Sequence, residues 1–278
     1  MTHTVSDSAL GKATEYISQY DASLLYPIAR SQSRAALALT DLPFYGVDVW
    51  TAYEVSWLNA RGMPQSAVAE FVFAADSANI IESKSFKLYL NSFNQTAFAR
   101  VDEVQAVLVR DLSHAAGAPV IVQLNKLADC NAKTMLASFT DMPSAVSLDN
   151  QDIAIDCYHP QPDYLRVGND TAMEILVSDI LKTNCPVTGQ PDWASIYIEY
   201  SGAAICHEGL LRYLVSFREH QDFHEHCVER IFCDITARCQ PDSLSVYARY
   251  TRRGGLDINP FRSSDPKAAP PAARLWRQ

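Results

Sequence analysis

The 278-residue chain lacks several features that mark common classes of protein. No apolar stretch reaches the roughly 18 residues that span a bilayer, and the first residues show no signal-peptide pattern, so we expect a cytoplasmic protein with no membrane contact. Lysine and arginine never form a run longer than a pair, and the net charge is −9. Because a nucleic-acid groove needs clustered cations, we expect no direct nucleic-acid partner.

Two nucleotide-binding signatures and paired cysteines are also missing. The sequence contains neither a GxGxxG motif nor a P-loop, so a nucleotide cofactor would have to bind outside those folds. The seven cysteines are odd in number and form no CxxC pair, which favours reduced thiols, most of them buried. The remaining composition, 48% hydrophobic and 20% charged, is ordinary for a globular protein and sufficient for about two domains.

The order of the predicted elements occurs twice along the chain. The first half shows strand patterns over 45–58 and 66–75, helical spacing over 87–93 and 100–113, and a strand over 118–124. The second half shows strands over 174–181 and 194–200, helices over 207–219 and 223–239, and a strand over 243–250. In addition, YLNSF at Tyr89–Phe93 matches YLVSF at Tyr213–Phe217, 213 − 89 = 124 residues later. We therefore predict an internal duplication of one β-β-α-α-β unit.

Connecting and terminal segments suggest the domain boundaries. Residues 139–162 are rich in Asp, Ser and Pro and are typical of a connector. Residues 263–278 are rich in Pro and Ala, which favours disorder. We predict an N-terminal domain over 1–140, a C-terminal domain over 141–262 and a disordered tail over 263–278.

One loop contains a cysteine that differs in setting from the others. The segment Thr183–Trp193 (TNCPVTGQPDW) is a turn-forming loop between two apolar strands, so Cys185 does not belong to a core-facing stripe like that of the last predicted helix. A thiol exposed at a loop mouth, with Asp192 seven positions later, can act as a nucleophile beside a proton donor. The alternative is a cysteine buried at a strand end as a small apolar residue.

The segment FHEH opens the last predicted helix. A carboxylate such as that of Glu225 is favourable in a first helical turn, and a solvated helix start is the simplest interpretation. A zinc site is a second possibility, although the spacings of a zinc finger are absent. The potential ligands are His224, His226, Cys227, Cys233 and Cys239.

Two further segments suit an anion such as a cofactor phosphate. Ile81–Tyr89 (IESKSFKLY) places two serines and two lysines before a helix, where serine caps and free N–H groups would attract an anion. Arg252–Gly255 (RRGG) follows a strand and combines paired cations with an accessible backbone. Ordinary capping and a basic turn are the alternatives.

Taken together, these segments resemble the long, duplicated form of the QueF family, the NADPH-dependent 7-cyano-7-deazaguanine reductases of queuosine biosynthesis, a tRNA modification. The resemblance covers residues 20–262, and the tail after Arg262 looks longer than is usual in the family. The matching motifs are ESKSFKLYLNSFNQT (Glu82–Thr96), NCPVTGQPDW (Asn184–Trp193), FHE (Phe223–Glu225) and RRGGLDINPFR (Arg252–Arg262).

The resemblance implies a fold and a set of roles. The fold is α+β, with two tandem tunnelling-fold (T-fold) domains whose antiparallel sheets carry helices on one face, and the expected assembly is a homodimer. Cys185 resembles the nucleophile that adds to the nitrile of 7-cyano-7-deazaguanine, and Asp192 the proton donor. Residues similar to the substrate-binding set are Ile81, Glu82, Ser83, Phe223, His224 and Glu225. Residues similar to the NADPH-binding set are Ser83, Lys84, Arg253 and Gly254, and no metal is implied.

Two alternatives to nitrile reduction stay open from the sequence. One is a zinc-dependent T-fold cyclohydrolase that uses the cluster of His224, His226 and cysteines. The other is a T-fold module that binds purine-like ligands without catalysis. Metal content distinguishes the first from a reductase, and a covalent adduct at Cys185 distinguishes the second.

Overall fold

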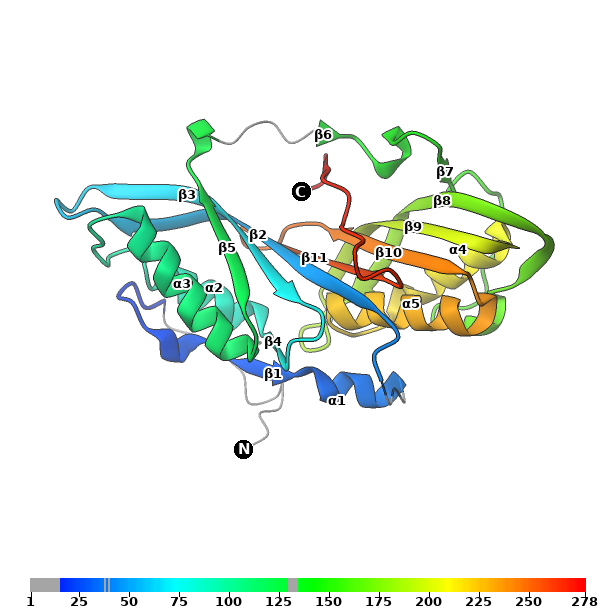
Figure 1. Ribbon diagram of the computed structural model, residues 1–278, viewed down its shortest axis with the longest axis horizontal. Helices are drawn as coiled ribbons and strands as arrows, with labels where there is room; N and C mark the ends of the chain where they lie inside the picture. The colour runs from blue at the N-terminus through cyan, green and yellow to red at the C-terminus, as the bar shows by residue number, and fades with distance from the viewer. Residues whose placement is uncertain (1–15, 38, 40, 130–134) are drawn as a thin grey trace. The chain divides into compact units, whose positions relative to one another are not determined.

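The computed structural model describes residues 16–37, 39, 41–129 and 135–278 (Figure 1). These residues form two compact units, and neither is contiguous in sequence. The first contains the described residues up to 37, together with 48–129 and 253–257, and the second contains 39, 41–47, 135–252 and 258–278. The predicted domain boundary at residue 140 stays a prediction. Each unit, however, includes a short segment that we had predicted to belong to the other domain.

The first unit has a three-stranded sheet covered by two helices. Its strands lie in the order β5 (Val120–Asn125), β3 (Pro64–Ala74) and β2 (Tyr45–Leu58), with residues 48–58 of β2 in this unit. The helices are α2 (Ser83–Asn91) and α3 (Val101–Ala116). A small antiparallel sheet of β1 (Pro27–Ala29) and β4 (Asn79–Ile81) leads into α1 (Arg30–Arg34) and α2, respectively. Short 3₁₀ turns lie at Ala22–Leu24, Ala35–Leu37 and Leu127–Asp129.

Hydrophobic periodicity explains these elements. In β3 the side chains of Ala67, Ala69, Phe71 and Phe73 alternate with more exposed neighbours and are buried. In α3, Val104, Leu108 and Leu112 recur at helical spacing and are fully buried. Gly117 ends α3 in the left-handed conformation at φ 69°, which glycine adopts without a Cβ clash.

The second unit has a larger sheet and two helices. The strands lie in the order β11 (Leu256–Ser263), β10 (Ser243–Tyr250), β9 (Pro191–Ile205), β8 (Val167–Asn184) and β7 (Ala145–Ser147), and residues 258–263 of β11 belong here. All neighbours are antiparallel except β7 and β8. The helices are α4 (His207–Ser216) and α5 (His224–Cys239). A parallel pair joins β6 (Met135–Leu136) to β12 (Arg274–Leu275), and 3₁₀ turns lie at Phe139–Asp141, Pro162–Tyr164 and Phe217–Glu219.

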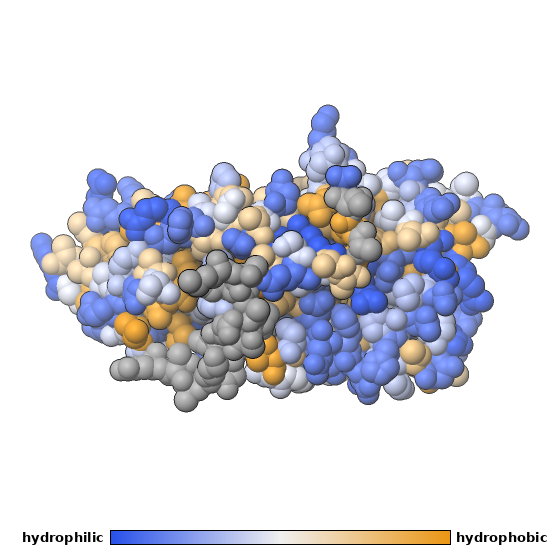
Figure 2. Space-filling view, turned by 90° about the horizontal axis from the view of Figure 1, so that it is seen from below, coloured by the Kyte–Doolittle hydropathy of each residue, from blue (hydrophilic) through white to orange (hydrophobic). Residues whose placement is uncertain are grey.

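Both faces of this sheet are covered. On one face α5 buries the stripe that the sequence predicted, namely Cys227, Val228, Ile231, Phe232 and Ile235. Another buried cluster contains Phe139, Val177, Tyr197, Tyr247, Phe261 and Leu275. The surface of this unit that is visible from below is mostly hydrophilic (Figure 2).

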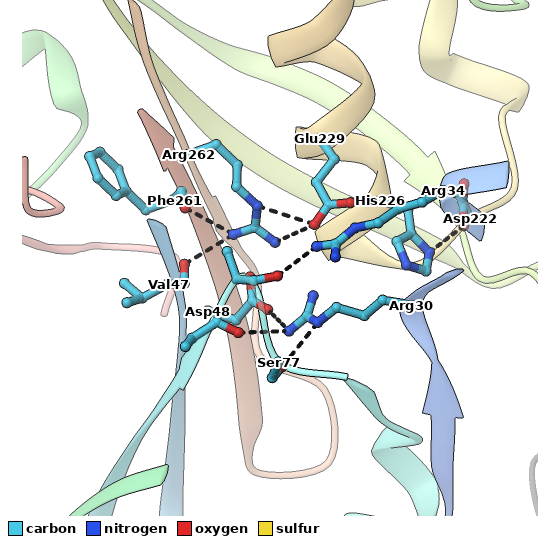
Figure 3. Close-up of polar contacts among 12 residues, drawn as sticks. Arg30, Arg34, Val47, Asp48, Ser77, Asp222, His226, Glu229, Phe261 and Arg262 are labelled. Atoms are coloured by element: carbon cyan, nitrogen blue, oxygen red, sulfur yellow. Dashed lines mark hydrogen bonds and ion pairs between the residues drawn. The ribbon is translucent and has the colours of Figure 1, made fainter. Parts of the chain in front are cut away.

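The predicted α+β class with antiparallel sheets and helices on one face is confirmed, and so is the repeated order. The first unit contains β2, β3, α2, α3 and β5 in the order β-β-α-α-β, and the second contains β8, β9, α4, α5 and β10. Each unit also holds a buried ion pair (Figure 3). In the first unit Arg30 and Asp48 approach to 2.5 Å, and in the second Arg262 donates to Glu229 at 2.8 Å.

The structure corrects two predictions about the C-terminal region. The sequence analysis missed strand β11, in which every residue is buried, because Asp257, Asn259 and Pro260 conceal an apolar pattern. The prediction that 263–278 are disordered is wrong. Leu275 is 1% exposed and completes a hydrophobic cluster, and the Gln278 amide donates to the Tyr250 carbonyl at 3.0 Å.

The cysteines agree with the sequence only in part. The six described cysteines are all free thiols, and three of them, Cys185, Cys227 and Cys239, are buried, so burial of most cysteines is not borne out. Cys130 lies outside the described residues. Among the described helices, none combines the length and apolarity that crossing a membrane requires.

Candidate functional site

Cys185 and Asp192 lie at one end of the β8–β9 hairpin in the second unit. Thr183 pairs with Asp192 and Asn184 with Pro191, so Cys185 directly follows the last strand pair. The Cys185 N–H donates to the Gln190 carbonyl at 2.9 Å, which closes the turn. The hairpin therefore holds the predicted nucleophile and the predicted proton donor at the same end of the sheet.

The prediction of an exposed thiol at the loop mouth is wrong. Cys185 is 3% exposed and Asp192 is 6% exposed, whereas Val187 at the tip of the loop is 39% exposed. The physical reason is the tight turn: the Gly189 N–H donates back to the Cys185 carbonyl at 3.1 Å, so residues 187–190 at the tip, rather than the cysteine, face solvent. A substrate must therefore reach a sulfur with little exposed surface.

The start of α5 supplies three more predicted residues. Phe223 is the N-cap residue, and His224 and Glu225 begin the helix. Glu225 is 2% exposed and the His224 side chain 15%, so the alternative of a solvated helix start is wrong. Glu225 thus lies with His224 in the buried start of the helix and stays a predicted substrate-binding residue.

His224 joins the hairpin to α5. Its Nε2 lies 3.5 Å from Oδ2 of Asp192, and its Nδ1 lies 3.3 Å from the Ile258 carbonyl. The imidazole also stacks on the ring of Tyr250, with ring centroids 3.7 Å apart and planes inclined by 6°. The structure thus places His224, a predicted substrate-binding residue, next to Asp192, the predicted proton donor.

A second link runs through Asp222, just before Phe223. The Asn184 N–H donates to the His220 carbonyl at 2.8 Å, and the Asp222 N–H donates to the Asn184 carbonyl at 3.2 Å. The carboxylate of Asp222 contacts Nδ1 of His226 at 3.3 Å. Although burial opposes ionisation, the contacts of its carboxylate with His220 and His226 hold the pKa of Asp222 well below its usual range. The residue before Cys185 is therefore tied to the segment that begins α5.

In the first unit, Glu82 begins α2 and caps it. Its two carboxylate oxygens accept the N–H groups of Lys84 and Ser85, each at 2.7 Å. The prediction of a serine cap with free N–H groups is therefore wrong for Lys84 and Ser85. Their N–H groups already donate to the carboxylate of Glu82. Burial raises the pKa of Glu82, an effect that the backbone hydrogen bonds and the two nearby lysines, Lys84 and Lys87, partly offset. Ile81 is buried in β4, and Ser83 is half-buried.

Residues 253–255 of the RRGG segment form a tight turn beside α2 in the same unit. The Arg253 N–H donates to the Leu256 carbonyl at 2.8 Å, and Gly254 and Gly255 have φ of 61° and 74°, the geometry of a two-residue hairpin turn. A Cβ at Gly255 would lie 2.7 Å from a carboxylate oxygen of Glu54. Nζ of Lys87 lies 3.4 Å from the Arg253 carbonyl. The structure thus brings the turn of Arg253 and Gly254 to the helix that carries Lys84.

Metal ligands do not gather in the part of the chain that the structure describes: no three His, Cys, Asp or Glu side chains lie close enough together to hold an ion. His226 faces Asp222, and Cys227 is fully buried. The zinc-dependent alternative therefore gains no support from the geometry.

Sequence reasoning missed two residues that adjoin the site. Asp222 carries no motif of its own, and its importance comes from contacts with segments distant in sequence. Tyr250 was assigned only to a strand, but strand alternation places it on the same face as Val246 and Ala248, the face opposite Tyr247. That alternation was the available signal.

Comparisons with known proteins cover nearly the whole chain. A family described as "Nitrile reductase, 7-cyano-7-deazaguanine-reductase N-term" matches residues 16–124, and one described as "QueF-like protein" matches residues 191–269. A curated NADPH-dependent 7-cyano-7-deazaguanine reductase of Burkholderia multivorans is 57% identical, with 98% of each chain covered. One of Albidiferax ferrireducens is 56% identical, covering 99% of this chain and 100% of its own.

A solved structure of an archaeosine synthase QueF-Like in the apo form aligns with a TM-score of 0.30 and 16% identity, over 34% of this chain and 94% of its own, which is too little to bear on the fold. The sequence relatives are decisive by themselves, because their identity is high and extends over both units. The chain belongs to the family of NADPH-dependent 7-cyano-7-deazaguanine reductases.

Proposed function

We propose that this protein reduces the nitrile of 7-cyano-7-deazaguanine to the aminomethyl group at the expense of NADPH, through a thioimide on Cys185, in the biosynthesis of queuosine. The observation that carries the proposal is the hairpin end of the second unit, where Cys185, Asp192 and His224 are held together, in a chain 57% identical to a curated reductase.

Cys185 and Asp192 perform the addition step. The sulfur, as the thiolate, attacks the nitrile carbon, the carbon–nitrogen triple bond becomes a C=N bond, and the nitrogen takes a proton from Asp192. A nitrile accepts hydride poorly, whereas the polarised thioimide carbon accepts it readily. Hydride addition and departure of the thiolate leave an imine, and a second hydride and proton complete the amine. The overall balance is one nitrile, two NADPH and two protons to one amine and two NADP⁺.

Recognition of the deazaguanine relies on carboxylates. Its ring N–H and exocyclic amine are donors, and Glu82 and Glu225 are buried acceptors. Each oxygen of Glu82 accepts one backbone N–H and has a further lone pair for a ligand. An analogue without these donors would lose these hydrogen bonds in a buried site, so discrimination should be strong. Phe223, His224, Ile81 and Ser83 complete the proposed substrate set.

The residues proposed for NADPH suit its phosphates. Lys84, Ser83 and Arg253 carry donors, and Gly254 adds no side chain of its own to the turn, beside which the Lys87 side chain lies. When bound, NADPH supplies the hydride. The role of the chain is to neutralise the phosphates with Lys84 and Arg253 and to hold the substrate carbon at Cys185.

Turnover and adduct formation together test the proposal. Wild-type protein mixed with 7-cyano-7-deazaguanine should consume two NADPH per nitrile. The decrease in NADPH absorbance measures this consumption. Without NADPH, the intact mass should rise by the mass of the nitrile. Cys185→Ala should abolish both signals, whereas Cys157→Ala, a matched control at a half-buried thiol of the same unit, should preserve them.

The outcomes separate the alternatives. No turnover in the wild type, or full activity in Cys185→Ala, contradicts the proposal. Ligand binding without an adduct supports a non-catalytic module, and stoichiometric zinc in purified protein supports the cyclohydrolase. A homodimer, a cytoplasmic location and the absence of a direct nucleic-acid partner remain predictions of the family resemblance and of the composition.

A further inference from the structure

Tyr250 forms a flat surface against His224. It is the last residue of β10, its side chain is fully buried, and its ring lies parallel to the imidazole at 3.7 Å. Parallel contact at this distance is direct van der Waals contact over the whole imidazole face. A neighbour of irregular shape could fill the same space without defining the plane of the imidazole.

The imidazole has two further contacts that depend on that plane. Nε2 faces Asp192 at 3.5 Å, and Nδ1 faces the Ile258 carbonyl at 3.3 Å. Rotation of the imidazole about its bond to Cβ would move both nitrogens out of reach. The Tyr250 ring opposes this rotation because a turned imidazole would collide with it.

Tyr250 is itself held firmly. Its N–H donates to the side-chain oxygen of Asn259 at 3.1 Å, and its carbonyl accepts the Gln278 amide at 3.0 Å. Asn259 is fully buried and Gln278 is 7% exposed, so both anchors lie within the packed interior. The flat surface against His224 is therefore rigid, as a positioning element must be.

The hydroxyl group of Tyr250 lies beside Thr183 and Cys227. Within the described residues, its contacts there do not reach the geometry of a full hydrogen bond. Burial raises the pKa of Tyr250, and the charges of Cys227 and Asp192 act in the same direction, so the phenol stays protonated. The ring, rather than the hydroxyl, is the part of Tyr250 that acts on His224.

We propose that Tyr250 is a positioning residue of the reductase, which fixes the imidazole of His224 so that its Nε2 faces Asp192 while the same ring holds the substrate. This inference rests on the proposed function, because His224 and Asp192 have their roles there.

Replacement of the ring by a flexible side chain of similar bulk tests the inference. Tyr250→Met should raise KM for 7-cyano-7-deazaguanine about five- to tenfold, while Tyr250→Phe should stay within about twofold of wild type. Tyr247→Met is the matched control, because Tyr247 is equally buried on the same strand but faces the opposite side of the sheet. It should lower the melting temperature and leave KM unchanged.

Coupling to His224 completes the test. In a His224→Gln background, Tyr250→Met should change KM by less than about twofold, because the residue through which it acts is gone. A KM of Tyr250→Met equal to wild type, equal impairment of Tyr250→Phe, or the same factor in both backgrounds overturns the inference. If Tyr250→Met does not fold by circular dichroism, Tyr250→Leu takes its place. Absence of wild-type turnover instead contradicts the proposed function.

Discussion

The two units share a scaffold that is alike at the level of single hydrogen bonds. In the first unit the Tyr89 hydroxyl donates to Asp111 at 2.8 Å, and in the second the Tyr213 hydroxyl donates to Asp234 at 2.6 Å. Both tyrosines are fully buried. Each bond connects the two helices of its unit, α2 to α3 and α4 to α5. The short sequence match therefore marks a repeated structural joint.

The same joint repeats in its neighbouring contacts. A serine hydroxyl donates to the tyrosine carbonyl at 2.6 Å in both units, and a phenylalanine ring meets the tyrosine edge-on at 5.2 Å and 84° in one and 5.3 Å and 85° in the other. The residues are Ser92 and Phe93 in the first unit and Ser216 and Phe217 in the second.

The units differ where the proposed chemistry lies. The residue that precedes α2 is Glu82, which caps the helix with its side chain, and the residue at 82 + 124 = 206 is Cys206, which makes no side-chain cap. Conversely, the hairpin of the second unit contains Cys185, whereas the corresponding β2–β3 turn contains Asn59 and Gly62. A duplicated scaffold therefore retains its joints, while its helix starts and hairpin tips are free to diverge.

The largest expected effects concern the buried ion pairs, one in each unit (Figure 3). Asp48→Ala and Glu229→Ala should each reduce the free energy of unfolding by about 3–5 kcal/mol, because each removes a buried carboxylate that pairs with a buried arginine. The double variant Glu229→Leu with Arg262→Met should recover most of the loss. Denaturant titration measures these free energies of unfolding. A double variant whose loss equals the sum of the losses of its single variants would contradict the prediction.

The tyrosine joints should differ in strength. Tyr213→Phe should cost about 1–3 kcal/mol, because Asp234 loses its closest donor. Tyr89→Phe should cost less, because Asp111 keeps Tyr20 at 2.7 Å and Arg110 at 2.9 Å. Equal losses on thermal unfolding would show that the additional partners of Asp111 carry no stability.

Asp222 should make the second unit sensitive to acid. Its pKa is lowered in the folded protein, so its contribution is complete above the ordinary value of about 3.9 and is lost as the pH falls through the folded value. Asp222→Asn should be less stable at pH 7 by about 1–3 kcal/mol, and the difference should shrink on acidification. Asp76→Asn, at an exposed turn, is the control and should show no such pH-dependent difference.

The smallest effects concern the helix starts that distinguish the units. Cys206→Ser should stabilise the protein by about 0.5–1 kcal/mol, because it gives α4 the side-chain cap that it lacks. Glu82→Ser should keep the cap of α2, with a stability change below about 1 kcal/mol, while KM for the nitrile substrate rises. An unchanged KM in Glu82→Ser would remove Glu82 from the proposed substrate set.

Periodicity and motifs were sufficient for much of this description. The stripe of α5, the strand over 45–58 and the duplicated order follow from local spacing, because burial of one face imposes a period on the sequence. The long motifs around Glu82, Cys185, His224 and Arg253 were enough to identify the family, since several long motifs in a fixed order rarely occur together by chance.

Tertiary structure decided how those motifs are held. Burial of Cys185, use of Glu82 as a helix cap, packing of Leu275 in the tail and stacking of Tyr250 on His224 all depend on segments distant in sequence. The exposure of a side chain and the pKa of a carboxyl group are set by whichever atoms pack around them. Neighbouring residues in the sequence do not determine which atoms these are, because folding brings them from distant parts of the chain.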